Sequence, residues 1–159
     1  GSKRMKRVCF VCLGNICRSP LAEAIFRELI EEQGLEDEIA VASRGTADYH
    51  IGEGPDKRTI AVAQRNGTPI HHTANQLSAD DFYTYDLLVV MDESNKKNTL
   101  KVAPADANYT LVKMRDFDTE NLGADVVDPW FGDEQGFDEC YEVLHRSCSN
   151  LLNQLKKEL

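Results

Sequence analysis

The segment Val11–Pro20 combines residue types that together could bind and transfer a phosphate group. Cys12 offers a nucleophilic sulfur, and Arg18 places a planar cation six residues later. Between them, Gly14 and Asn15 tolerate left-handed backbone, which allows a tight turn. Backbone N–H groups at the start of a helix have no intrahelical partner, so such a turn can surround an anion. The arginine fork can bind two phosphate oxygens, and positive surroundings favour the thiolate form of the cysteine. The residues predicted to form this phosphate-binding loop are Leu13, Gly14, Asn15, Ile16, Cys17, Arg18 and Ser19.

Spacing alone does not identify such a loop, because the chain repeats the spacing. Cys140 is followed six residues later by Arg146 and then by Ser147. Cys140, however, lies on the apolar stripe of the strongest helical pattern in the chain, where helix hydrogen bonds use up the backbone N–H groups. We therefore interpret Cys140 as a core residue. The strand, turn and helix start around Cys12 are the distinguishing context.

Short apolar runs alternate with helical patterns along the chain, which predicts an α/β fold. The first run is apolar throughout, as expected of a strand buried on both faces of a parallel sheet. Ser19-Pro20 marks the start of the following helix, with Glu23 placed for a first-turn contact, and Gly34 marks its end. We expect a doubly wound, flavodoxin- or Rossmann-like fold: a four-stranded parallel sheet with helices on both faces and the phosphate-binding loop after the first strand. The predicted strands are residues 8–13, 39–43, 87–91 and 109–114, and the predicted helices are 19–33, 58–66, 94–102 and a final one with apolar residues from 137 to 155.

The composition is that of one ordinary globular domain. Of 159 residues, 42% are hydrophobic and 28% are charged, and the longest apolar runs are too short to span a membrane. The net charge of −9 argues against binding to nucleic acids, whose phosphates require Lys and Arg. Five cysteines, an odd number, without a secretory signal indicate a reducing, cytoplasmic setting. Gly1-Ser2 is typical of a tag-cleavage scar, so we expect residues 1–5 to be a tag remnant and extension, and 6–159 to be a single domain.

The stretch Cys12–Pro20, which reads CLGNICRSP, resembles the phosphate-binding loop of the low-molecular-weight protein tyrosine phosphatases. That family pairs a Cys-x5-Arg loop near the N-terminus with an Asp-Pro motif more than a hundred residues later, and Asp128-Pro129 matches the second motif. The resemblance runs from about Lys6 to the final helix. It implies hydrolysis of protein phosphotyrosine and small aryl phosphates, of the acid phosphatase type, without a metal ion or cofactor.

The resemblance also assigns roles to the matching residues. Cys12 corresponds to the nucleophile that takes the phosphoryl group as a cysteinyl phosphate, and Arg18 to the clamp on the transition state. Asp128 corresponds to the general acid that protonates the leaving phenolate and then, as a base, activates water to release inorganic phosphate. Arg18 and the loop amides would supply the positive charge that a metal ion supplies elsewhere.

Four residues match positions that support the loop in the family. Ser19 corresponds to the hydroxyl that hydrogen-bonds the thiolate, and Asn15, Ser43 and His72 to residues that hold the loop open. From the residues alone, Asn15 could serve only an unusual backbone conformation, Ser43 only a turn and His72 only ordinary packing. The pair His71-His72 is too isolated to indicate a metal site.

Aromatic and apolar residues are expected to form the walls of the site, with Trp130 and Phe131 on one side and Leu13 and Tyr49 on the other. The family often has tyrosines at the positions of Trp130 and Phe131, and their phosphorylation is associated with regulation. Neither residue here can be phosphorylated, so we expect instead a stronger preference for bulky aryl phosphates. Cys17 matches the cysteine that protects the oxidised nucleophile of the family as a disulfide; a small packing residue is the alternative.

Other functions on the same pattern are less well supported. A thiol-based arsenate reductase uses an additional cysteine pair, and this chain has no cysteine between Cys17 and Cys140. A phosphocarrier module needs no built-in acid, and a catalytically dead phosphopeptide reader would not need an intact set of Cys12, Arg18 and Asp128. A phosphoarginine phosphatase is the nearest alternative, but that branch tends to carry Thr where this chain has Ile16. The sequence leaves the oligomeric state open, with a monomer as one candidate.

The charges are unevenly distributed along the chain. Residues 1–19 contain Lys3, Arg4, Lys6, Arg7 and Arg18 and no acid, whereas residues 116–142 contain ten acids and no Lys or Arg. An acid-rich segment around Asp128 suggests that the site prefers phosphopeptides with basic flanking residues. Equal kcat/KM for basic- and acidic-flanked peptides at low salt would contradict that hypothesis.

Overall fold

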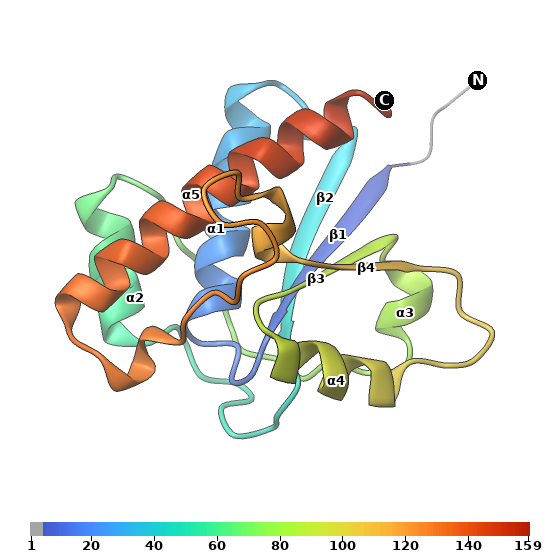
Figure 1. Ribbon diagram of the computed structural model, residues 1–159, viewed down its shortest axis with the longest axis horizontal. Coiled ribbons are helices and arrows are strands. Elements are labelled where there is room, and N and C mark those ends of the chain that lie inside the picture. The colour runs from blue at the N-terminus through green and yellow to red at the C-terminus, as the bar shows by residue number, and fades with distance from the viewer. Residues whose placement is uncertain (1–4) are drawn as a thin grey trace.

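A computed structural model describes residues 5–159 and confirms a four-stranded, all-parallel sheet (Figure 1). The strands lie in the order β2-β1-β3-β4. They are β1 (Lys6–Cys12), β2 (Ile39–Gly45), β3 (Leu87–Val90) and β4 (Thr110–Lys113). Of the expected N-terminal extension, residues 1–4 lie outside the described part of the chain.

The two central strands are buried on both faces, as their continuous apolar sequences predict. In β1, Val8 and Phe10 point to one core, whereas Cys9 and Val11 point to the other. The register places Val8 opposite Val41 of β2 and opposite Leu87 of β3. Hydrophobic burial on both sides therefore fixes β1 in the middle of the sheet, with its carboxyl end directed at the first loop.

Helices cover both faces of the sheet, which gives the doubly wound arrangement. The larger core lies under α1 (Arg18–Glu32), α2 (Lys57–Arg65) and α5 (Glu134–Lys156). The smaller core lies under α3 (Asp81–Thr84) and α4 (Glu93–Val102). Cys140 is buried in α5, as expected of a core residue. No helix in residues 5–159 is long and apolar enough to cross a membrane.

The long connection between β4 and α5 contains two short 3-10 helices that the sequence did not predict, η1 (Met114–Phe117) and η2 (Pro129–Phe131). Asp118, which is completely buried, holds the start of this connection. Its carboxylate pairs with Arg146 of α5 at 2.7 Å and with Arg115 at 2.9 Å. The hydrogen bonds from Arg146 lower the pKa of Asp118 to about 2, so the carboxylate stays charged at neutral pH. The connection is thus tied to α5 before it reaches Asp128.

Candidate active site

The loop between β1 and α1 is held in an unusual backbone conformation by the side chain of Asn15. Asn15 has a φ of 58°, the only positive φ at a non-glycine residue in the described chain. Its Nδ2 donates to the hydroxyls of Ser19 at 2.8 Å and Ser43 at 3.0 Å, and its Oδ1 accepts from the N–H of Asn75 at 2.9 Å. These three bonds from α1, β2 and a later loop offset the cost of left-handed backbone. Asn15 therefore has the unusual backbone conformation considered from the sequence, and its side chain connects the loop to these three segments.

Behind the loop, a buried acid completes the hydrogen-bond network. Ser43 Oγ donates to Glu23 Oε1 at 2.6 Å, and His72 Nδ1 lies 3.7 Å from the same oxygen. His72 Nε2 lies 2.8 Å from the carbonyl of Asn15. Burial alone would raise the pKa of Glu23, but the His72 and Ser43 contacts lower it, so Glu23 is ionised. The expected first-turn contact of Glu23 is wrong: the side chain faces β2 instead of the helix end, because it lies on the buried face of α1.

The loop also requires close approach to a glycine in β2. A Cβ on Gly45 would lie 2.9 Å from the carbonyl oxygen of Leu13 and 3.0 Å from Cβ of Asn15. The first distance is shorter than real Cβ atoms show and the second is tighter than most Cβ contacts, so the loop occupies the space that a side chain on Gly45 would fill.

Cys12 lies at the base of this loop, and its sulfur is 3.0 Å from the Ser19 hydroxyl. Since Ser19 Oγ accepts from Asn15, its own proton is free to point at the Cys12 sulfur or at the carbonyl of Arg44, 3.4 Å away. The other cysteine of the loop differs in character, because burial raises the pKa of Cys17 to about 12. Cys17 is therefore a protonated thiol at neutral pH, whereas Cys12 sits where a hydroxyl donor can stabilise a thiolate.

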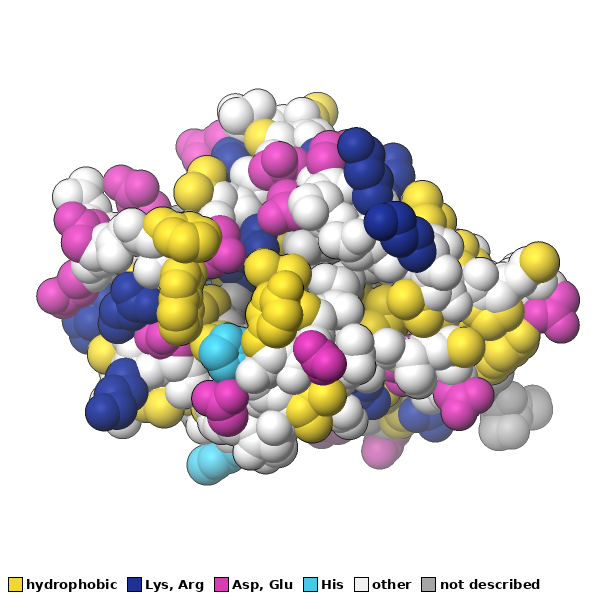
Figure 2. Space-filling model, turned by 90° about the horizontal axis from the view of Figure 1, so that it is seen from below, with side chains coloured by type: hydrophobic (Ala, Val, Ile, Leu, Met, Phe, Trp, Pro, Cys, Tyr) yellow, Lys and Arg dark blue, Asp and Glu magenta, His cyan; other side chains and the backbone are white. Residues whose placement is uncertain are grey.

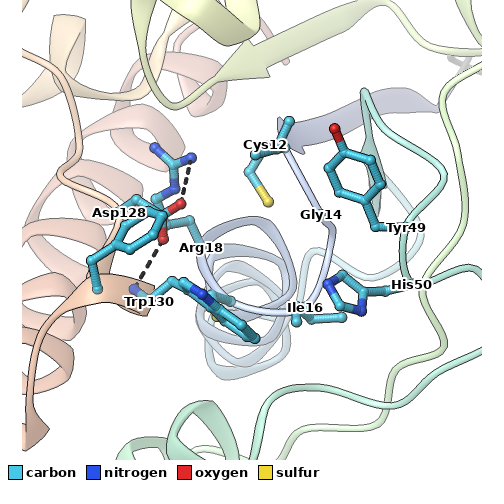
Figure 3. A pocket seen from close by; sticks show the side chains of 11 residues that line it. Cys12, Gly14, Ile16, Arg18, Tyr49, His50, Asp128 and Trp130 are labelled. Carbon is cyan, nitrogen blue, oxygen red and sulfur yellow. Dashed lines mark hydrogen bonds and ion pairs between the residues drawn. The ribbon is translucent and has the colours of Figure 1, made fainter.

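Arg18 is 2% exposed and is oriented by partners from two other segments. Its Nη1 donates to Asp92 Oδ2 at 2.7 Å and to the carbonyl of Val126 at 2.8 Å. Its Nη2 lies 3.6 Å from Asp128 Oδ2, the contact drawn in Figure 3. Burial would lower the pKa of Arg18, but the neighbouring Cys12, Asp92 and Asp128 raise it, so the guanidinium stays charged. One side of the arginine fork is thus used for structure, and the other faces the site.

Asp92 is a site residue that the sequence analysis did not identify. It follows β3 and is the N-cap residue of α4, where its Oδ1 accepts from the N–H of Asn95 at 2.7 Å. The sequence does contain a signal for Asp92, because it directly follows the predicted strand 87–91. The carboxyl end of that strand lies at the same sheet edge as Cys12, where site residues are expected.

Asp128 and Trp130 are positioned together by η2 and by an arginine of α2. The Asp128 carboxylate accepts from the N–H of Trp130 at 3.1 Å. Arg58 donates to the Trp130 carbonyl at 3.1 Å and lies 5.3 Å from the centre of the indole ring. Arg58 in turn pairs with Asp56, whose N–H donates to the carbonyl of Ile16. Arg58, which the sequence analysis also missed, therefore links the acid segment to the phosphate-binding loop.

A cavity of about 350 Å³ joins these elements. Cys12, Arg18 and Asp128 line it, and in Figure 3 the Cys12 sulfur and the Asp128 carboxylate both face this cavity. Figure 2 shows hydrophobic side chains gathered around a hollow on this side of the molecule. The lining also includes all four predicted wall residues and one that was not predicted, His50, whose ring centre lies 6.0 Å from that of Trp130. The wall residues are Leu13, Tyr49, Trp130 and Phe131, and the remaining loop residues in the lining are Gly14, Ile16 and Cys17.

The acid-rich segment carries less free charge than its sequence suggests. Six of its ten acids form ion pairs with Lys or Arg from other elements, namely Asp118, Glu120, Asp125, Asp128, Glu134 and Asp138. Most of the charge that would favour basic flanking residues is therefore already paired within the protein. Residues 5–159 contain no group of three or more His, Cys, Asp or Glu side chains arranged to hold a metal ion.

Comparison with known proteins gives consistent matches over nearly the whole chain. Residues 7–159 match the family model described as low molecular weight phosphotyrosine protein phosphatase. The Schizosaccharomyces pombe protein of that name is 39% identical over 150 residues, which cover 94% of this chain and 96% of the yeast protein. A protein tyrosine phosphatase from Entamoeba histolytica, solved with Hepes in its active site, has a TM-score of 0.91 and 33% identity, covering 96% of this chain and 98% of its own. An arginine phosphatase from Drosophila has a TM-score of 0.84 and 29% identity, and the match covers 96% of this chain and 98% of the Drosophila chain.

The close approach at Gly45 gives a test of the loop. Gly45→Ala should displace Leu13 and Asn15, because the new methyl group would meet backbone atoms. We expect the Kd for inorganic phosphate, measured by calorimetry, to rise about tenfold or more, a loss of about 1.4 kcal/mol. Gly54→Ala is the matched control, since nothing lies within 4 Å of its Cβ position. Equal phosphate affinity in both variants would contradict the requirement for glycine.

Proposed function

Because this chain belongs to the low-molecular-weight phosphotyrosine protein phosphatase family and is therefore a phosphatase, we propose that it hydrolyses phosphotyrosine in proteins, and small aryl phosphates, through a cysteinyl phosphate on Cys12. The observation that carries this proposal is the cavity in which Cys12, Arg18 and Asp128 meet. The nucleophile lies at the base, the cation beside it and the acid at the rim. No metal ion takes part in the proposed steps.

In the first step, the phosphate group enters the loop and the Cys12 sulfur attacks phosphorus in line with the leaving oxygen. The bond between phosphorus and the phenol oxygen breaks, and Asp128 gives its proton to that oxygen. Arg18 and the loop N–H groups hold the equatorial oxygens, where negative charge accumulates. The contact of Arg18 with Asp92 and Val126 matters here, because a guanidinium already oriented needs no rearrangement in the transition state.

In the second step, water replaces the phenol. The Asp128 carboxylate takes a proton from the water as its oxygen attacks phosphorus, and the sulfur–phosphorus bond breaks. Inorganic phosphate leaves, and Cys12 is again a thiolate that the Ser19 hydroxyl, 3.0 Å away, can stabilise. In this proposal Asn15, Ser43 and His72 touch no substrate and keep the loop open through the network with Glu23.

The walls of the cavity favour aromatic substrates. Leu13, Tyr49, Trp130 and Phe131 all line the cavity, and a flat ring can pack against such side chains. Phe131 is 88% exposed, which leaves its ring available to a substrate. A phosphoarginine phosphatase remains the second candidate, because the Drosophila arginine phosphatase shares the fold. Ile16 in the cavity lining and the aromatic walls favour phosphotyrosine over that candidate.

Two substitutions test the mechanism. Hydrolysis of p-nitrophenyl phosphate in excess chelator should disappear in Cys12→Ser, since the hydroxyl is a far weaker nucleophile. Asp128→Ala should lower kcat/KM about a hundredfold or more while phosphate still binds. Cys140→Ser is the matched control, because Cys140 has the same spacing to an arginine but lies in α5, and it should retain activity. Turnover by Cys12→Ser would refute the proposal.

Trp130→Ala tests the wall. Removal of the indole should lower kcat/KM for aryl phosphates about tenfold more than for alkyl phosphates, because only the aryl ring packs against it. Leu122 is an exposed hydrophobic residue outside the cavity lining, and serves as the control. Leu122→Ala should leave the ratio of kcat/KM for aryl phosphates to kcat/KM for alkyl phosphates unchanged. An unchanged ratio in Trp130→Ala would show that the indole does not select the ring.

Cys17 remains the proposed redox partner. Peroxide would oxidise the Cys12 thiolate to a sulfenic acid, and the Cys17 sulfur would then attack it, forming a disulfide and releasing water. Mass spectrometry of the loop peptide after peroxide treatment should show this disulfide and recovery of activity on reduction. After the same peroxide treatment, the Cys17→Ser variant should lose activity and should not regain it on reduction. Irreversible oxidation of Cys12 with Cys17 left free in the wild-type protein would contradict this role.

A further inference from the structure

The segment that carries Asp128 is anchored just before the aspartate. The N–H of Val126 donates to the carbonyl of Met91 at 2.8 Å, and the carbonyl of Val126 accepts from Arg18 at 2.8 Å. Val127, which lies between this anchor and Asp128, is 78% exposed. Residues 125 and 126 are therefore the last fixed points of the backbone before Asp128 on its N-terminal side.

A lysine outside the cavity holds the first of these two residues. Lys113 ends β4, and its ammonium pairs with Asp125 at 2.7 Å and with Glu93 at 3.4 Å. The same ammonium donates to the carbonyl of Gly123 at 2.9 Å. Lys113 is nearly buried, so this charge is withdrawn from water and has its partners within the protein.

Asp125 connects Lys113 to the N-terminal end of α4, which lies next to Arg18. Its Oδ1 also accepts from the N–H of Glu93 at 3.2 Å, and its carbonyl accepts from Arg115 at 3.3 Å. Glu93 directly follows Asp92, the partner of Arg18. The bonds of Asp125 thus attach the backbone just before Asp128 to the N-terminal end of α4. The same helix end orients Arg18 through Asp92.

We propose that Lys113 is a positioning residue for the general acid, because through Asp125 it fixes the backbone from which Asp128 reaches the leaving oxygen. This inference rests on the proposed function, in which Asp128 donates that proton. Lys113 does not line the cavity and touches no substrate. Its effect should therefore fall on proton donation and leave phosphate binding unchanged.

Leaving groups of different basicity separate these two effects. A phenolate leaves slowly unless it is protonated, whereas p-nitrophenolate leaves with less help from an acid. The parameter kcat/KM covers the steps up to departure of the leaving group. In Lys113→Met we expect kcat/KM to fall about tenfold for phenyl phosphate and less than about threefold for p-nitrophenyl phosphate. Competitive inhibition by inorganic phosphate should be unchanged.

Arg65→Met is the matched control. Arg65 also pairs with two carboxylates, Glu134 at 3.3 Å and Asp138 at 2.6 Å, but these lie in α5, after residues 125–128, which carry the proposed acid. Arg65→Met should keep the wild-type ratio of kcat/KM for phenyl phosphate to kcat/KM for p-nitrophenyl phosphate. Asp125→Asn removes the charge at nearly constant size and should shift the ratio in the same direction as Lys113→Met. It provides the test if Lys113→Met does not fold.

Equal losses for the two substrates in Lys113→Met, or an unchanged ratio in Asp125→Asn, would overturn the inference. Weaker inhibition by phosphate would also overturn it, since Arg18 would then be the residue displaced. Asp128→Ala in the same assay separates this failure from failure of the proposed function. If Asp128→Ala increases the dependence on the leaving group and Lys113→Met does not, only the role of Lys113 is wrong. If Asp128→Ala has no such effect, the proposed acid is wrong as well.

Discussion

Asn15 holds the phosphate-binding loop in a left-handed backbone conformation that residues other than glycine rarely adopt. Its amide binds two hydroxyls and a backbone N–H from three separate elements, so the strain is supported from outside the loop. Ser43 and His72 connect the same network to the buried Glu23. A loop supported in this way keeps its shape when the site is empty, and little rearrangement is needed when an anion enters.

The electrostatics of the site are local. The chain carries a net charge of −9, yet the cavity that is proposed to bind a phosphate contains the buried Arg18 and lies at the start of α1. Arg18 is surrounded by Asp92, Asp128 and Cys12, which keep it charged in spite of its burial. Most acids of the segment around Asp128 are paired with basic side chains. Net charge therefore says little about the anion that this site can bind.

The sequence predicted the parallel sheet and the main helices, because apolar runs and turn residues are local signals. Cys12, Arg18 and Asp128 were picked out by resemblance to the family, and the structure brings the three to one cavity. The two matches to the Cys-x5-Arg spacing were separated correctly, since Cys140 lies in a helix. Asp92 and Arg58 were missed because their contacts, Asp92 with Arg18 and Arg58 with Trp130, span more than seventy residues. Local periodicity cannot reveal such pairs. The short helices α3, η1 and η2 were also missed, because three or four residues do not establish a helical period.

The central claim is that the phosphoryl group is transferred to Cys12 before water receives it. The most direct measurement is to quench the protein with acid during turnover of p-nitrophenyl phosphate and to locate the phosphate by mass spectrometry of the digested chain. We predict phosphate on the sulfur of Cys12 in the wild-type protein, none on Cys140, and none anywhere in Cys12→Ser. Release of p-nitrophenol and inorganic phosphate at full rate with no modified Cys12 peptide at any quench time would contradict this account.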